Sequence, residues 1–436
     1  MRLKGQKKNK IHVITLGCSK NTVDSENLIT QLKHNQFEVE HDADQSDAKV
    51  IVVNTCGFIE RAKKESIDTI LEYAEAKNEG RVDRLIVTGC LSQRYKDQLK
   101  TEIPEVDAWF GTMDLPALLA NLQADYKKEL LGERMISTPG HYAYLKISEG
   151  CNRTCSFCAI PLMRGGHVSR PMESLVHEAE FLAARGVKEL ILIAQELTYY
   201  GLDLYKKRKL PELLAALGQV EGIEWIRLHY AYPSKFPLEI LDEMAVNPKI
   251  CKYLDLPLQH ASDAVLKAMR RQITKSETID LIGKIRDKIP GIALRTTLLV
   301  GFPNETEKEF DELCDFITAM QFDRLGVFTY SPEEDTEAYS LQDLVPEEIK
   351  TARADRIMEI QRDISRMKNE SKIGRILPVM IDRKEKKHWV GRSEADSPEV
   401  DQEIHLAPTK ESLQPGNLVS IRITGAEDYD LMGEIV

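Results

Sequence analysis

The sequence lacks any long apolar run: no stretch approaches the roughly 18 apolar residues that a membrane span needs. It is also short of positive charge, because 59 Lys and Arg against 70 Asp and Glu give a formal net charge of −11. A protein that binds nucleic acid along a broad face usually has a basic surface, so this balance favours a basic partner. The first ten residues are basic and polar without an apolar core, so we expect no secretory signal.

These absences lead us to expect a cytoplasmic protein that has no membrane contact. Its 436 residues, 42% of them apolar and 30% charged, are typical of a soluble globular chain of two to four domains. The eight cysteines would then lie in a reducing compartment. Metal binding or catalysis is therefore favoured over disulfides as the explanation for them.

Three cysteines fall within eight residues, at Cys151, Cys155 and Cys158, after a strand-like run at 142–148. Clustered thiolates select soft metals such as zinc, copper(I) and iron–sulfur clusters. A structural zinc normally has four protein ligands, and no fourth Cys or His completes this motif nearby. A 4Fe-4S cluster usually takes four cysteines, so three would leave one iron open. The spacing favours such a cluster, with structural zinc as the alternative.

The same spacing resembles the radical S-adenosylmethionine (SAM) superfamily. That resemblance implies that the amino and carboxylate groups of SAM chelate the open iron. It also implies a central domain that binds SAM beside the cysteine loop.

The N-terminal part, residues 1–138, contains near-continuous apolar runs that alternate with helix-like stretches. This alternation predicts an open parallel α/β sheet. A cysteine directly follows each of three runs, and ligands bind at the carboxyl edge of such sheets. We interpret these residues as a second three-cysteine cluster site, the alternative being unrelated buried cysteines. The three residues are Cys18, Cys56 and Cys90.

The central part, residues 139–371, contains six strand candidates separated by helical stretches. This pattern predicts a partial (β/α)6 barrel of the TIM type, with its chemistry at the carboxyl ends of the strands. The strand candidates are residues 142–148, 189–194, 225–229, 253–256, 293–300 and 324–329.

Residues near these strand ends are candidates for binding SAM. Phe157 is a candidate for packing on the adenine, although a core aromatic is the alternative. Gln195 and Glu196 are candidates for the methionine ammonium, because a carboxylate suits a cation. Arg295 is a candidate for the SAM carboxylate, the alternative being an ion pair within the barrel. His260 is either a proton carrier or a structural histidine, and we favour the second.

The C-terminal part, residues 372–436, alternates apolar and polar residues between glycines, which predicts a small antiparallel β-barrel. Its size and place resemble the OB-like TRAM domain of RNA-modifying enzymes. Nine Lys and Arg against twelve Asp and Glu give this part a net charge of −3, unusual for an RNA binder. The acidic run 427–430 is either a solvated loop or a contact for a basic protein.

Along its whole length the chain resembles the radical SAM methylthiotransferase family, and several stretches resemble its ribosomal-protein branch, known as RimO. The tRNA-modifying branch tends to have Gln-Met-Asn after the first cysteine, where this chain has Ser-Lys-Asn. One departure is Asn304, at a position where glycine is usual. The stretches that carry the resemblance are residues 16–21, 54–59, 144–151, 255–260 and 426–431.

The resemblance implies a transferase that uses two 4Fe-4S clusters and SAM to replace a C–H hydrogen by a methylthio group. The target implied is the β-carbon of an aspartate in small-subunit ribosomal protein 12, free or on the ribosome. An electron donor protein is implied as a further partner, and tRNA is disfavoured. The alternatives are a tRNA adenosine methylthiotransferase and, from another class, a non-catalytic metal-containing RNA-binding protein. The reaction also requires the N-terminal cysteines to face the mouth of the central barrel.

Overall fold

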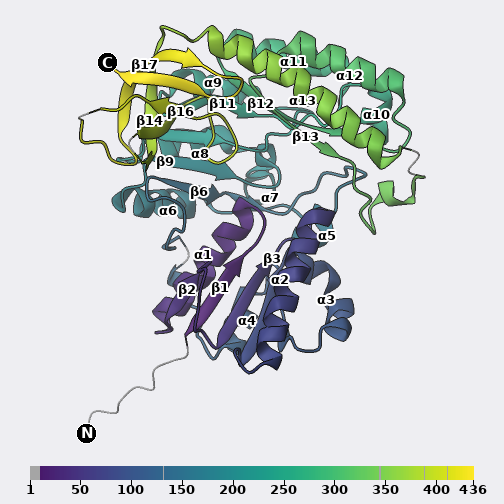
Figure 1. The fold of residues 1–436 in the computed structure, drawn as a ribbon, viewed down its shortest axis with the longest axis vertical. Coiled ribbons are helices and arrows are strands. Elements are labelled where there is room, and N and C mark those ends of the chain that lie inside the picture. Colours follow the sequence, from purple (N-terminus) through teal and green to yellow (C-terminus); the bar gives the residue numbers. More distant parts are fainter. Residues whose placement is uncertain (1–9, 131, 343–344, 387, 410) are drawn as a thin grey trace.

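The computed structural model describes residues 10–130, 132–342, 345–386, 388–409 and 411–436, which form a five-stranded sheet, a six-stranded sheet, a closed five-stranded barrel and a two-stranded hairpin (Figure 1). The predicted fold class is confirmed: a parallel α/β sheet, a partial barrel and a small closed barrel follow one another along the chain. In this described part no helix is long and apolar enough to cross a membrane. The residue boundaries that we expected for the three domains stay a prediction.

The N-terminal sheet has five parallel strands in the order β2-β1-β3-β4-β5. Its central strand β3 reads VIVVNT and is buried along its whole length, because helices cover both faces of the sheet. The strands are β1 Ile11–Thr15, β2 Val39–His41, β3 Val50–Thr55, β4 Arg84–Gly89 and β5 Ala108–Trp109. The helices are α1 Ser19–His34, α2 Glu60–Asn78, α3 Cys90–Glu102 and α4 Leu115–Asn121.

The central sheet has six parallel strands in the order β13-β12-β11-β10-β9-β6, and it stays open between β13 and β6. The largest apolar core lies between these strands and the helices outside them. The strands are β6 Tyr142–Lys146, β9 Glu189–Ile193, β10 Trp225–Leu228, β11 Ile250–Asp255, β12 Ala293–Val300 and β13 Arg324–Thr329. The main helices are α6 Met172–Ala184, α8 Leu210–Gly218, α9 Glu239–Val246, α10 Asp263–Ala268, α11 Lys275–Lys288, α12 Glu307–Met320 and α13 Glu347–Glu370.

The first predicted strand of the barrel is divided in two. The amide of Ile147 still donates to the carbonyl of Ile193 at 3.0 Å, but the chain then leaves the sheet. The next two residues form β7 (Ser148–Glu149), which pairs antiparallel with β8 (Val168–Ser169). This small hairpin clamps the base of the cysteine loop, which spans the residues between its strands.

The C-terminal barrel is closed in the order β14-β15-β16-β18-β17. All its strand pairs are antiparallel except β16 with β18, which are parallel because β17 runs back between them in the chain. Branched and aliphatic side chains such as Ile381, Ile421 and Leu431 fill its interior. The strands are β14 Ile376–Glu385, β15 His388–Ser393, β16 Ile404–Leu406, β17 Leu418–Ala426 and β18 Leu431–Ile435.

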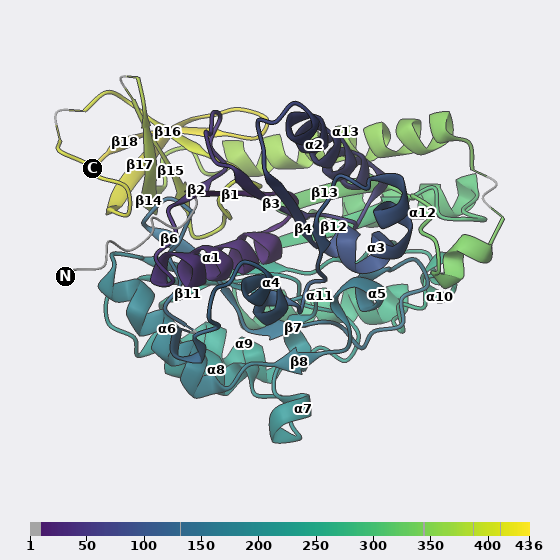
Figure 2. The same cartoon turned by 90° about the horizontal axis from the view of Figure 1, so that it is seen from below.

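The inner face of the central sheet is covered from two sides. The segment 394–402 of the C-terminal barrel accepts two hydrogen bonds from this sheet. The Tyr142 hydroxyl donates to Glu399 at 2.6 Å, and the Tyr253 hydroxyl donates to Asp401 at 2.8 Å. Helix α1 lies against β6 in both views, and its Val23 packs with Tyr142 (Figures 1 and 2). Helix α1 of the N-terminal part and segment 394–402 of the C-terminal part therefore both pack on the central sheet.

Candidate active site

The N-terminal cysteines come together from three separate strand ends. Cys18 is exposed, whereas Cys56 and Cys90 are each 7% exposed. Close approach depends on Gly17, which has φ of 96° and where a Cβ atom would lie 2.6 Å from Cys56 Cβ. Gly89, with φ of 100°, would place a Cβ 2.5 Å from the carbonyl oxygen of Thr55. Only glycine suits both positions, because each combines a left-handed backbone with direct contact.

These thiols are close enough to influence one another electrostatically. The pKa of the Cys90 thiol is raised to about 12, chiefly by burial, while Arg164 lowers it and the charges of Cys18 and Cys56 add to the increase. Burial also raises the pKa of Cys56 above its ordinary value. A bound metal deprotonates a coordinating thiol outright, so a cationic cluster would offset the raised pKa of the buried Cys56 and Cys90 thiols.

The central cysteines lie on one loop between β7 and β8. The loop is tight: Gly150 has φ of 75°, and a Cβ there would lie 2.0 Å from the carbonyl oxygen of Gly166. The Arg153 amide donates to Cys151 Sγ at 3.4 Å, and the Cys158 amide donates to the carbonyl of Cys155 at 3.2 Å. Burial raises the pKa of Cys151 to about 11 and that of Cys158 to about 12.

Polar side chains of the barrel approach the middle cysteine of this loop. Arg271 Nη1 lies 3.5 Å and Tyr232 Oη 3.7 Å from Cys155 Sγ. Arg153 lies between two rings, with its guanidinium carbon 3.9 Å from the centroids of Tyr199 and Tyr232. Donors of this kind stabilise the charge of thiolates, and hydrogen bonds to the sulfurs tune an iron–sulfur centre.

In the described residues no three side chains of His, Cys, Asp or Glu are arranged to hold a single metal ion. A 4Fe-4S cluster does not need such an arrangement, because each cysteine binds a different iron. The two three-cysteine groups, residues 18, 56, 90 and residues 151, 155, 158, are called the N-terminal triad and the central triad below. Their donor chemistry fits such a cluster.

The two triads lie on facing elements. Helix α3, which begins at Cys90, packs against α5 (Ile160–Arg164), which begins two residues after Cys158. Cys90 packs with Ala159 in one apolar cluster. Arg164 Nε donates to Cys90 Sγ at 3.2 Å. The segment that follows the central triad therefore touches a member of the N-terminal triad.

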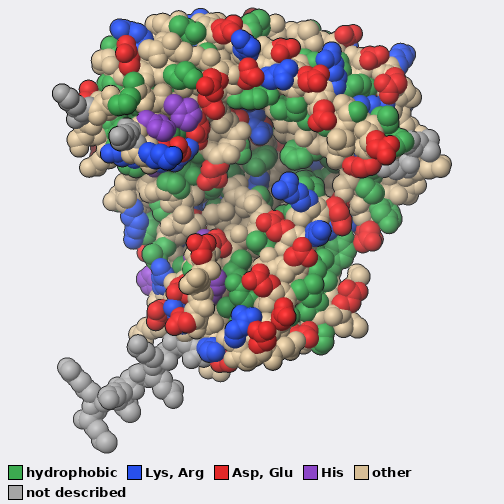
Figure 3. All heavy atoms as spheres, viewed as in Figure 1, with side chains coloured by type: hydrophobic (Ala, Val, Ile, Leu, Met, Phe, Trp, Pro, Cys, Tyr) green, Lys and Arg blue, Asp and Glu red, His purple; other side chains and the backbone are tan. Residues whose placement is uncertain are grey.

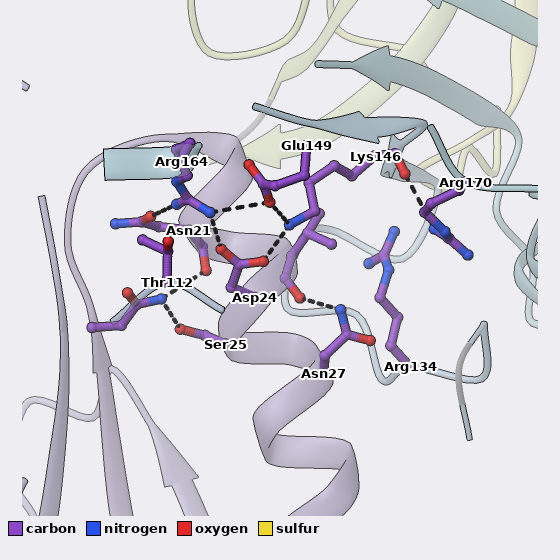
Figure 4. A network of polar contacts seen from close by, with 12 residues as sticks. Asn21, Asp24, Ser25, Asn27, Thr112, Arg134, Lys146, Glu149, Arg164 and Arg170 are labelled. Carbon is purple, nitrogen blue, oxygen red and sulfur yellow. Dashed lines mark hydrogen bonds and ion pairs between the residues drawn. The ribbon is translucent and has the colours of Figure 1, made fainter. Parts of the chain in front are cut away.

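A buried polar network joins the two domains beside this contact (Figure 4). Arg164 Nη1 lies 2.6 Å from Asp24 of α1 and 3.3 Å from Glu149. Lys146 also pairs with both carboxylates, at 2.7 Å from Glu149. Burial alone would raise the pKa of Glu149, but Lys146 and Arg164 outweigh it and lower that pKa to about 2. Arg164 also donates to Asn21, so α1, the cysteine loop and Cys90 share one set of contacts.

The residues that we expected to bind SAM all lie near the central triad or on the inner face, and three of them have polar partners. Gln195 Nε2 donates to Glu149 at 2.5 Å, while Gln195 Oε1 is buried without a partner among the described residues. Glu196 accepts from Thr198 N at 2.7 Å and lies 3.3 Å from Arg153 Nη2. These contacts leave their assignment to SAM a prediction.

Phe157 and Arg295 have different surroundings. Phe157 packs edge-to-face on Phe302, with the ring centroids 6.4 Å apart. Arg295 lies 3.1 Å from Asp255 and 3.3 Å from Asp401, so it links β12 both to β11 and to the C-terminal barrel. The ion pair that we considered as an alternative for Arg295 is present, and its role with SAM stays a prediction.

The loop after β12 explains the asparagine where the resemblance expects glycine. Asn304 has φ of 67°, a left-handed conformation that asparagine tolerates better than most residues. Glu305 accepts the amide of Gly301 at 2.8 Å, and burial raises its pKa to about 7. Burial lowers the pKa of His260 to about 3, and its Nδ1 accepts the amide of Ser262 at 3.0 Å. His260 is therefore neutral, which favours its structural interpretation.

Sequence reasoning missed the basic residues that contact the cysteines. Arg153 lies inside the cysteine motif and Arg164 lies six residues after it. That proximity was the available signal, but most arginines in loops are solvated. Arg271 and Tyr232 are distant in sequence and are brought to Cys155 only by the barrel.

Three family models match the chain in succession. Residues 10–111 match the Uncharacterized protein family UPF0004, residues 145–317 the Radical SAM superfamily and residues 373–436 the TRAM domain. The central match, together with the full-length relatives described below, makes the chain a radical SAM enzyme, with SAM and a 4Fe-4S cluster as its cofactors.

Solved structures share the fold at low sequence identity. The radical SAM methyltransferase TsrM from Kitasatospora setae, with cobalamin and a 4Fe-4S cluster bound, has a TM-score of 0.56 at 16% identity over 74% of this chain and 75% of that one. The cobalamin-dependent radical SAM enzyme OxsB, with SAM bound, has a TM-score of 0.53 at 12% identity over 80% of this chain and 56% of that one.

Curated relatives match the chain end to end. The ribosomal protein uS12 methylthiotransferase RimO of Cytophaga hutchinsonii is 58% identical, with 100% of both chains covered. Proteins of the same name from Flavobacterium johnsoniae, at 58% identity over 100% of both chains, and from Bacteroides thetaiotaomicron, at 50% identity over 99% of both, match as well. This chain belongs to the RimO family of ribosomal protein uS12 methylthiotransferases.

Proposed function

We propose that this protein is a radical SAM methylthiotransferase that acts on ribosomal protein uS12. It adds a methylthio group to the β-carbon of an aspartate in that protein. The reaction takes place in the cytoplasm, on uS12 that is either free or bound in the ribosome. An electron donor protein is a further partner. The relatives that match the whole chain carry this activity in their names.

One observation carries the proposal: two three-cysteine groups lie on elements that contact each other. The Arg164 to Cys90 bond of 3.2 Å and the packing of Cys90 on Ala159 support a reaction space shared by both groups. When bound, the clusters and SAM supply the one-electron chemistry that replaces an unactivated C–H hydrogen, which acid–base side chains cannot do.

The chain itself holds and shields these groups. Cys151, Cys155 and Cys158 hold the cluster that binds SAM, and the three cysteines of the N-terminal triad hold a second cluster. We assign the two clusters to domains at residues 1–138 and 139–371, with the TRAM domain at 372–436. The TRAM segment 394–402 covers the inner face of the sheet, which helps to exclude water from the reaction space.

Four further residues are proposed to position SAM. Gln195 and Glu196 border the central triad through Glu149 and Arg153, so they lie where the methionine ammonium would reach a carboxylate. Phe157 offers a ring face beside Cys158. Arg295 would bind the SAM carboxylate only through an N–H group that does not already contact Asp255 or Asp401.

The test is one anaerobic reaction followed by mass spectrometry. The protein, reconstituted with iron and sulfide, is given SAM, a reductant and a uS12 peptide or, separately, unmodified tRNA. We expect a methylthio mass gain on the peptide aspartate. A gain on tRNA adenosine alone would overturn the substrate, and a protein that carries both clusters but forms no 5′-deoxyadenosine would overturn the reaction.

Cysteine variants assign the two clusters independently of activity. Replacing all three residues of either triad by alanine should halve the bound iron, because each triad holds one of two equal clusters. Cys314→Ser is the matched control, since Cys314 lies half-buried on α12 outside both triads. Unchanged iron in either triad variant would contradict the assignment of that triad.

A further inference from the structure

One buried ammonium group beside the N-terminal triad has no counter-ion. Lys20 lies two residues after Cys18 in the first turn of α1 and is 8% exposed. Among the described residues, no carboxylate lies within ion-pair distance of its Nζ atom, which instead sits 3.2 Å from the centroid of the Tyr230 ring. Nearby Lys146 is different, because Asp24 and Glu149 both pair with it.

An aromatic ring attracts a cation but does not neutralise it. A cation–π contact offsets the desolvation of a buried cation only in part, and buried lysines in folded proteins are nearly always paired with an acid. The first turn of α1 adds the partial positive charge of a helix N-terminus to the same place. Lys20 therefore creates a local positive site that lacks an anion.

The carboxylate that contacts the Tyr230 backbone already has other partners. Asp255 Oδ2 accepts the amide of Tyr230 at 3.0 Å, and its Oδ1 pairs with Arg295 at 3.1 Å. Arg295 in turn pairs with Asp401 at 3.3 Å. Those two carboxylates are thus bound to one arginine, and neither compensates Lys20.

The neighbouring histidine gives no compensation either. Burial lowers the pKa of His229 well below its ordinary value, and the positive charges of Arg227, Arg295 and Lys20 lower it further. His229 is therefore neutral, and its Nε2 is 2.9 Å from Ser397 Oγ. The same effect indicates that the charge of Lys20 is felt at the inner face of the central sheet.

Tyr230 is held in an unusual backbone conformation that presents its ring to Lys20. Its φ of 63° is rare for a bulky residue, so the backbone is strained there. Asp255 fixes its amide, and its carbonyl accepts the amide of Leu197 at 3.2 Å. Such strain is typically retained at ligand-binding positions.

The position of this pair suits a substrate. Lys20 comes from the N-terminal domain and Tyr230 follows β10 of the central sheet, so the contact spans the junction of the two domains. Figure 3 shows a hollow where the central part meets the N-terminal part, with Lys or Arg side chains beside it. The exposed member of the N-terminal triad, Cys18, is two residues away.

We propose that Lys20 binds the side-chain carboxylate of the target aspartate and selects an acidic protein side chain as the substrate. This inference rests on the proposed function. The carbon that loses hydrogen is bonded directly to the carboxylate carbon, so an ammonium that fixes the carboxylate also fixes the reacting carbon. The tRNA-modifying pattern Gln-Met-Asn puts methionine at this position, and an adenosine has no carboxylate to bind.

The experiment compares two synthetic uS12 peptides, one with aspartate and one with asparagine at the target position. Binding of each peptide to the anaerobic, iron-loaded enzyme is measured by calorimetry for wild type, Lys20→Met and Lys33→Met. Lys33 is an exposed lysine at the far end of the same helix, which makes it the matched control. Methylthio transfer to the aspartate peptide is measured in parallel.

We expect wild type and Lys33→Met to bind the aspartate peptide roughly ten- to a hundredfold more tightly than the asparagine peptide, as for one charge-assisted hydrogen bond. Lys20→Met should bring this ratio close to one. Loss of folded or iron-loaded protein lowers the binding of both peptides alike, so the ratio reports on Lys20 itself. Lys20→Gln gives the same readout if Lys20→Met does not fold.

Two outcomes overturn different statements. If wild type modifies the aspartate peptide but Lys20→Met keeps the full aspartate preference, the inference about Lys20 is wrong and the proposed function stands. If wild type binds neither peptide and modifies tRNA, the proposed function fails and takes the inference with it.

Discussion

The two cysteine triads have the same number of ligands but are built in different ways. The central triad lies within eight residues of one loop, whose ends the β7–β8 hairpin holds together. The N-terminal triad spans residues 18 to 90 and exists only because three parallel strands end at one edge. A local motif tolerates shifts of the surrounding sheet, whereas a triad assembled from separate strand ends depends on every contact that sets their spacing.

Among the variants considered, Gly17→Ala should have the largest effect, because it disturbs the N-terminal triad and leaves the central triad intact. The new Cβ would lie 2.6 Å from Cys56 Cβ at a φ of 96°, so Cys18 and Cys56 must move apart. We expect half of the bound iron to be lost and methylthio transfer to fall roughly a hundredfold, as for a misplacement of about 1 Å. Iron analysis and product mass spectrometry measure the two effects.

Gly140→Ala is the control for that variant. A Cβ at Gly140 meets nothing within 4 Å, and its φ is not in the left-handed region, so iron and activity should be unchanged. If Gly17→Ala lost all of its bound iron instead of half, the central triad would have lost its cluster as well. That result would show that the two triads are not independent.

Arg164→Met tests the connection between the triads. The variant removes the hydrogen bond to Cys90 and leaves Lys146 as the cation that still pairs with Asp24 and Glu149. Removing one partner from a buried ion pair costs about 3 kcal/mol or more of unfolding free energy. Chemical denaturation of wild type and variant measures the difference.

The surface pair of Arg356 with Glu359 provides the control, because both side chains are more than half exposed. Arg356→Met should change the unfolding free energy by less than about 0.5 kcal/mol. If Arg164→Met were as small in effect, the network of Figure 4 would not hold the two domains together.

A change of pH should alter the stability of the protein through Glu305, which lies in the loop after β12. The folded pKa of Glu305 is about 7, above its ordinary 4.5. Its contribution to stability is therefore fully present below pH 4.5 and is lost as the pH rises through 7. Glu305→Gln should remove this loss, so wild type should lose about 1 to 3 kcal/mol relative to the variant between pH 4.5 and pH 7.5.

Denaturation curves at those two pH values measure the loss. Glu180→Gln, at an exposed position of α6, is the control and should track wild type at both. The opposite sign, with wild type gaining on Glu305→Gln as the pH rises, would mean that Arg353 at 2.9 Å outweighs the burial of Glu305.

How much the sequence predicts differs between the triads and their surroundings. Apolar runs that end at cysteines predict the sheet edge, because strand periodicity is local and parallel strands share direction. The partners of Gln195 and Glu196 were not predictable, since Glu149 and Arg153 meet them only when the loop folds onto the barrel. The contact of Lys20 was even harder to predict from the sequence, because its partner Tyr230 belongs to another domain.

The smallest expected effect concerns the contacts of single cysteines. Cys90 is contacted by an arginine from another domain, whereas Cys155 is contacted by Arg271 and Tyr232 of its own domain. Tyr232→Phe removes a hydroxyl that donates to the carbonyl of Arg271 at 2.9 Å. We expect a loss of about 1 kcal/mol in unfolding free energy.

Tyr199→Phe is the matched control, because Tyr199 stacks on Arg153 at the same 3.9 Å and keeps its ring in the variant. No hydrogen bond of the Tyr199 hydroxyl occurs among the described residues, so Tyr199→Phe should change the unfolding free energy very little. Equal losses in the two variants would show that the stacked arginine, and not the hydroxyl beside Cys155, supports the central triad. The central loop would then depend on packing, as the N-terminal triad depends on the packing of its strand ends.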